Sequence, residues 1–72
     1  MIELTRLYQQ RPGPGTPTEA VVAWYHAKGR IHELIGRSGG PDSAQELAIA
    51  AASYEHARRL ELQAGLVHNA AA

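Results

Sequence analysis

Residues 16–37, TPTEAVVAWYHAKGRIHELIGR, decide the fold that the sequence predicts. The stretch is typical of one long amphipathic helix, with Thr16 as N-cap, Pro17 at the first helical position and Glu19 closing a capping box with Thr16. At about 100° per residue, its apolar side chains cover roughly half of the circumference. A helix that packs against one neighbour needs a stripe of only about 100°. The pattern therefore predicts a helix with two contacts.

The predicted apolar sector of this helix divides by side-chain size. Small residues on one flank allow a neighbouring backbone to approach closely, whereas large residues protrude on the other flank. The small residues are Ala20, Ala23 and Ala27, and the large residues are Val21, Trp24 and Ile35. The other apolar members are Tyr25, Ile31 and Leu34, and the polar sector holds Glu19, His26, Gly29, Arg30, Glu33 and Arg37.

A second long helix follows a short turn. The Gly-Gly-Pro sequence at 39–41 ends the first helix, because glycine adopts the left-handed conformation and proline cannot continue a helix. The second helix is predicted to begin at Asp42 or Ser43, either of which could cap it, and to end at 63–64 before Gly65. A turn this short brings the second helix back beside the first as an antiparallel hairpin.

The second helix carries two adjoining apolar sectors, which leave only a narrow polar strip. Arg58 and Glu61 lie inside the first sector, where they can pair with each other or across an interface. The first sector holds Leu47, Ala50, Ala51, Tyr54, Ala57 and Leu62, and the second holds Ile49, Ser53, Leu60, Ala64 and, if the pattern continues past Gly65, Val67.

The period of residues 1–10 stays open. Met1, Leu4 and Tyr8 share a face in a helix, and Ile2, Leu4 and Tyr8 share one in a strand. We favour a helical turn or an irregular arm that docks its apolar side chains on the hairpin over a frayed terminus.

The predicted organisation has three parts. An N-terminal arm with a Pro/Gly linker spans 1–15, the helical hairpin spans 16–65, and a frayed tail spans 66–72. Seventy-two residues make at most one domain, and scaffolds of this size often rely on disulfides, metals or oligomerisation. The chain has no cysteine, which excludes disulfides and thiolate metal sites.

The excess apolar surface predicts self-association. The expected fold is all-α, an antiparallel two-helix hairpin that dimerises into a four-helix bundle. Tryptophan and tyrosine often dominate the binding energy of interfaces. The predicted interface consists of Val21, Trp24, Tyr25, Ile31, Ile35, Leu47, Tyr54, Arg58 and Glu61.

No pattern in the chain indicates catalysis. The sequence has no nucleophile elbow, HExxH, Walker or GxGxxG pattern. His26 and His32 lie about 120° apart on a helix and cannot chelate one ion. An intersubunit metal site that uses His32 or His56 is one alternative. The other, which we prefer, leaves His26 and His56 solvated and His32 at the core edge, with Glu33 and His32 as a surface pair. We expect no enzyme activity, no catalytic residue, no metal and no cofactor.

The charge pattern argues against a nucleic-acid partner. The formal net charge is zero, and glutamates lie near the most basic places, Arg30 with Arg37 and Arg58 with Arg59. A solvated face of mixed charge is the interpretation that we prefer. A nucleic-acid-associated regulator, with arginine patches brought together by dimerisation, is the alternative.

The predicted function is a small non-catalytic protein-protein interaction or regulatory module that acts through helix packing. Its expected partner is a second copy of itself, with an unidentified protein as the other candidate. No apolar run is long enough to span a bilayer, and the N-terminus lacks the apolar core of a signal peptide, so we expect no membrane partner and a cytoplasmic location.

Overall fold

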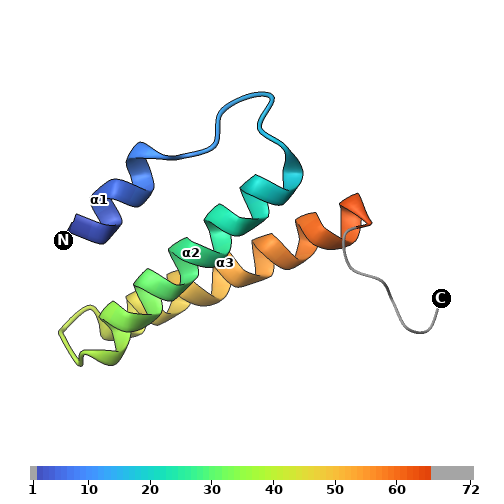
Figure 1. Ribbon diagram of the computed structural model, residues 1–72. Helices are drawn as coiled ribbons and strands as arrows, with labels where there is room; N and C mark the ends of the chain where they lie inside the picture. Colours follow the sequence, from blue (N-terminus) through green and yellow to red (C-terminus); the bar gives the residue numbers. More distant parts are fainter. Residues whose placement is uncertain (1, 66–72) are drawn as a thin grey trace.

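The computed structural model describes residues 2–65, with side chains from residue 4 onward; the predicted tail at 66–72 lies outside the described residues. It contains three helices, α1 (Ile2–Gln9), α2 (Thr18–Arg37) and α3 (Ser43–Ala64) (Figure 1). All regular secondary structure in this described part is helical, which confirms the predicted all-α fold class.

The three helices lie side by side in a single layer. α2 and α3 run antiparallel along their whole length as the predicted hairpin, and α1 lies beside the middle and second half of α2 (Figure 1). Within residues 2–65, α1 packs on α2 but not on α3. The molecule measures 43 × 29 × 12 Å, so its thinnest dimension is about the diameter of one helix with its side chains.

Small residues form the seam between α2 and α3. Gly29 and Gly36 of α2 are buried, as are Ala50 and Ala57 of α3, each pair being two helical turns apart. A Cβ atom on Gly29 would lie 2.6 Å from Cε1 of Tyr54. The helices therefore approach more closely than side chains at these glycines would allow.

The buried position of Gly29 corrects the sequence prediction, which placed this residue in the polar sector. A helical wheel assigns each position to a face by the hydrophobicity of its side chain, and glycine has no side chain. Leu34 is the converse error, because it belonged to the predicted apolar sector and is 68% exposed. The stripe that α2 buries is thus rotated away from the stripe of its largest apolar side chains.

The N-terminus of α2 differs from the predicted capping box. Pro17 occupies the N-cap position, the helix begins at Thr18, and no side chain caps it. The Thr16 hydroxyl instead accepts a hydrogen bond from the backbone N–H of Gly13 at 3.1 Å. Thr16 therefore closes the Pro/Gly linker and leaves the helix end to the backbone.

The hairpin turn and the end of α3 agree with the predicted use of glycine. Gly39 (φ 82°) and Gly65 (φ 70°) adopt the left-handed conformation, and Gly65 is the C-cap of α3. Asp42 is the N-cap residue of α3, but its carboxylate accepts no capping hydrogen bond. Ser43 spans the turn, because its hydroxyl donates to the backbone carbonyl of Gly36.

The N-terminal arm is a helix docked on α2, so its residues follow the helical period and not the strand period. An isolated helix of 8 residues is marginal in water, so α1 depends on tertiary contacts. Leu7 supplies the buried side chain of this contact, and its backbone carbonyl accepts a 2.8 Å hydrogen bond from Nε1 of Trp24.

The hydrophobic core of the described chain is small. Its buried apolar side chains are Leu7, Val22, Ala50 and Ala57, and no large side chain among the described residues is fully buried. Helices in a single layer do not enclose an interior, so most apolar side chains remain partly exposed to water. Among residues 2–65, no helix is both long enough and apolar enough to cross a membrane.

Candidate functional site

The hairpin layer presents two faces that differ in chemistry. Because each residue turns a helix by about 100°, Val21, Tyr25 and Lys28 fall on one side of the seam, and Leu34 falls on the other. Two contacts fix the corresponding sides of α3. Tyr25 meets His56 with ring centroids 4.3 Å apart, and on the opposite side the Tyr54 hydroxyl donates to Glu33 at 3.3 Å.

We call the first side the aromatic face, defined by Val21, Tyr25, Lys28 and His56. We call the second side the leucine face, defined by Leu34, Leu47, Tyr54 and Leu62.

The leucine face holds the most exposed large aliphatic side chains of the described residues. Leu34 is 68% exposed, Leu47 is 42% exposed and Leu62 is 52% exposed. Leu34 and Leu47 lie near the hairpin turn, whereas Leu62 lies near the open end. Charged residues of both signs lie between these two apolar ends: Arg30, Glu33, Arg58 and Glu61.

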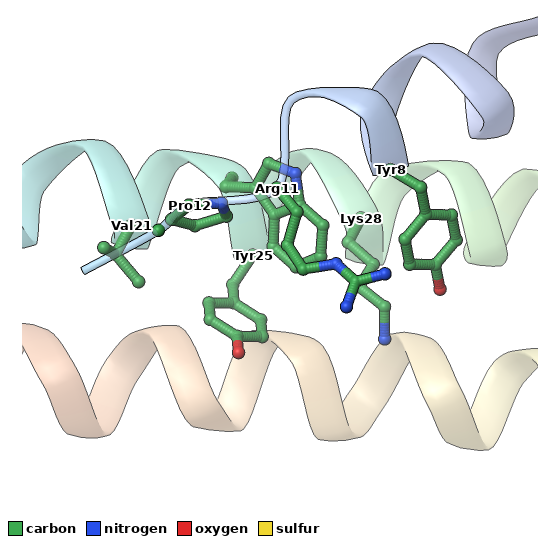
Figure 2. Close-up of a pocket in the computed structure, with 8 residues that line it drawn as sticks. Tyr8, Arg11, Pro12, Val21, Tyr25 and Lys28 are labelled. Carbon is green, nitrogen blue, oxygen red and sulfur yellow. The ribbon is translucent and has the colours of Figure 1, made fainter. Parts of the chain in front are cut away.

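The aromatic face contains a groove between α2 and the linker that follows α1. Figure 2 shows the charged ends of Arg11 and Lys28 between the rings of Tyr25 and Tyr8. Tyr8 and Trp24 pack edge to face at 6.0 Å, and Trp24 and Tyr25 do so at 5.0 Å. The groove has a volume of about 430 Å³, and its lining residues are Tyr8, Arg11, Pro12, Gly13, Val21, Trp24, Tyr25 and Lys28.

Histidine–glutamate pairs bridge the two helices of the hairpin. Nε2 of His26 lies 3.2 Å from Oε1 of Glu61, and Nδ1 of His32 contacts Oε2 of Glu46. His32 is buried, and its Nε2 has no hydrogen-bond partner among the described residues. His32 pairs with Glu46 of α3, which corrects the expected surface pairing of His32 with Glu33. The His26 side chain remains 40% exposed beside Glu61, so the expectation of a solvated His26 stands in part.

The structure distributes the predicted interface residues over both faces. Val21, Trp24, Tyr25 and Ile35 lie toward the aromatic face, where Trp24 is engaged by the arm. Leu47, Tyr54 and Arg58 lie on the leucine face, and Arg58 is exposed. Ile31 lies on the side of α2 that points away from α3. Glu61 pairs with His26 of the same hairpin.

Charge pairing weakens the arginine patches that the nucleic-acid alternative requires. Arg37 contacts Glu33 at 3.3 Å, and Arg59 contacts Glu55 at 3.3 Å, each one helical turn apart. Such exposed pairs contribute little to stability, but they place a carboxylate beside each guanidinium. Within residues 2–65, no three histidine, aspartate or glutamate side chains gather in a way that could hold a metal ion.

Comparison of the chain with protein-family models, with curated proteins and with solved structures finds no match. The candidate site therefore rests on the geometry of this chain alone.

Sequence reasoning missed the two features that organise the surface. The glycine seam had a signal in the spacing of Gly29 and Gly36, because a small residue every two helical turns is typical of close helix packing. The groove had no clear signal in the sequence. Tyr8 and Arg11 are far from Trp24 and Tyr25 along the chain, and only docking of the arm brings the four residues together.

The Tyr54–Glu33 contact predicts a stability change at alkaline pH. Burial raises the pKa of the Tyr54 hydroxyl above its usual value, and the negative charge of Glu33 and the hydrogen bond to it raise the pKa further. The neutral hydroxyl therefore contributes stability that is complete below about pH 10 and is lost as the pH rises through the folded-state pKa.

We expect Tyr54→Phe to lose less stability than the wild type between pH 9 and pH 11. Urea unfolding across this range measures the difference. Tyr25→Phe, which retains Tyr54, serves as the control and should follow the wild type. Equal alkaline losses in Tyr54→Phe and the wild type would contradict the assignment.

Proposed function

We propose that this protein is a small non-catalytic interaction module that acts as a homodimer through the leucine face of its hairpin. Two hairpins packed face to face would form a four-helix bundle. Any regulatory role would then follow from competition between self-association and binding of a second protein at the same face.

The observation that carries the proposal is the single-layer architecture. The molecule is 12 Å thick, and Leu34, Leu47 and Leu62 lie on one side of it with much of their surface in water. Burying apolar area stabilises an assembly by about 25 cal/mol per Å². A second layer of helices would bury these leucines between the two layers.

The distribution of side chains on the leucine face suits a twofold axis. A copy rotated about an axis through the middle of this face brings the turn end of one hairpin, with Leu34 and Leu47, onto the open end of the other, with Leu62. The intervening charges include both signs, so the same rotation can place opposite charges together. A surface that complements itself in this way favours a closed dimer.

The dimer is tested by changing exposed leucines that the single hairpin does not need. We expect the wild type to have twice the mass of one chain by light scattering at tens of micromolar. Leu34→Glu combined with Leu62→Glu should give the mass of one chain, because the rotation brings the new carboxylates together in a desolvated interface. Circular dichroism checks that the variant keeps its helices.

Ala52→Glu is the matched control. Ala52 is exposed on α3 and lies on the side that points away from α2, so its substitution should leave the mass of the dimer unchanged. A wild type that scatters light as one chain at these concentrations rules the homodimer out. A dimer that survives the double substitution places the interface on another face.

A further inference from the structure

The groove on the aromatic face carries unbalanced positive charge. Its lining residues include Arg11 and Lys28 and no aspartate or glutamate, although the whole chain has equal numbers of basic and acidic residues. Neither cation forms an ion pair with any residue that the structure describes, in contrast to Arg37 and Arg59. The groove therefore concentrates a positive potential that nothing nearby in the described chain neutralises.

The aromatic rings of the groove are held in fixed positions. The indole N–H of Trp24 is committed to the carbonyl of Leu7, and the indole makes edge-to-face contacts with both tyrosine rings of the groove. The guanidinium carbon of Arg11 lies 5.6 Å from the centroid of the Tyr8 ring, within cation–π range. Its N–H groups therefore remain available for an anion beside the rings.

We propose that this groove binds a small aromatic anion, a planar ring that carries a phosphate or a carboxylate group. The ring packs against Tyr25 and Trp24, and the anionic group lies between Arg11 and Lys28. Guanidinium and ammonium groups bind both anions through charge-assisted hydrogen bonds. A groove of about 430 Å³ falls within the size range of small-molecule sites, about 300–1,000 Å³.

Titration of the full chain with four probes tests the proposal by nuclear magnetic resonance. Adenosine monophosphate and indole-3-carboxylate combine a ring with an anion, whereas adenosine lacks the anion and inorganic phosphate lacks the ring. We expect at least one of the first two to shift the signals of Lys28 and of the single Trp24 indole N–H, with little effect from the last two. Which of the two binds distinguishes a phosphate ligand from a carboxylate ligand.

Substitution of the cations identifies the site. Arg11→Gln and Lys28→Gln should each weaken binding about tenfold, as expected for loss of one charge-assisted hydrogen bond. Arg30→Gln removes an exposed cation from α2 outside the groove and should leave the affinity unchanged. Binding should also weaken as salt is raised, because the groove is open to solvent.

Three results would overturn the proposal: no shift with either aromatic anion at millimolar concentration, equal binding of adenosine or phosphate alone, or unchanged affinity in both glutamine variants. The outcome is separable from that of the homodimer, because Arg11 and Lys28 lie away from the leucine face. Arg11→Gln should keep the mass of the wild type by light scattering.

Discussion

Replacing Gly36 with alanine should lower the free energy of unfolding by about 1–3 kcal/mol, the usual cost of overpacking a well-packed contact. The same change at an exposed position inside a helix would raise stability by about 1 kcal/mol, because alanine is the better helix former. The sign of the effect therefore reports whether α2 and α3 touch at this position.

The contact at Gly36 leaves no room for a methyl group. A Cβ atom there would lie 2.6 Å from Cγ of Leu47 and 3.2 Å from its backbone nitrogen. The Leu47 side chain can rotate toward solvent, but its backbone can move only if the helices separate. Gly29→Ala should act in the same direction through the Tyr54 ring, and the double variant should be the least stable.

Gly40→Ala is the matched control for the seam. A Cβ atom on Gly40 meets no described atom within 4 Å, and its backbone is not left-handed. This change should be neutral or stabilise the protein by about 0.4–1 kcal/mol, through the unfolded state. Urea unfolding followed by circular dichroism compares the variants. A Gly36→Ala variant that is as stable as Gly40→Ala would refute the close seam.

Replacing Trp24 with alanine should lower the free energy of unfolding by about 2–3 kcal/mol, below the about 3–5 kcal/mol typical of a fully buried aromatic because part of the ring stays in water. The change removes two ring contacts and the hydrogen bond to the Leu7 carbonyl. Most of this loss should appear as release of α1, which is too short to remain helical alone.

Trp24→Phe separates the ring from the hydrogen bond. It keeps an aromatic side chain and deletes the indole N–H, and it should cost about 1 kcal/mol, the net value of one hydrogen bond. Hydrogen exchange of the α1 amides measures release of the arm in both variants. His56→Ala removes an exposed ring that contacts Tyr25 and does not touch the arm, so it is the control. Unchanged α1 protection in Trp24→Ala would show that the arm docks by other contacts.

The arm also explains why the predicted interface is divided. Trp24 stood at the centre of that prediction because it is the largest apolar side chain of the first long helix. A helix of 8 residues from the same chain meets it instead, and the linker carries Arg11 to the same place. Apolar surface that a helical wheel assigns to a partner can thus be covered within the chain. Among the residues that the structure describes, Leu34, Leu47 and Leu62 are the most exposed large aliphatic side chains.

The sequence by itself determined the elements of this fold. It predicted two long helices that end before the Gly-Gly-Pro turn and before Gly65, as they do at Arg37 and Ala64. It also predicted left-handed glycine in the turn, and the structure has this conformation at Gly39 but not at Gly40. These features depend on backbone preferences and on residues a few positions apart, so they can be derived from one stretch at a time.

Only the tertiary structure decided which side chains the helices bury. The burial of Gly29, the pairing of His32 with Glu46 and the exposure of Leu34 all depend on the distance between backbones that are remote in sequence. Small residues at the seam let the two backbones approach closely, so the helices bury Gly29, Gly36, Ala50 and Ala57 and leave Leu34 exposed. Packing through these small residues leaves leucines on one face of the hairpin and an aromatic, cationic groove on the other.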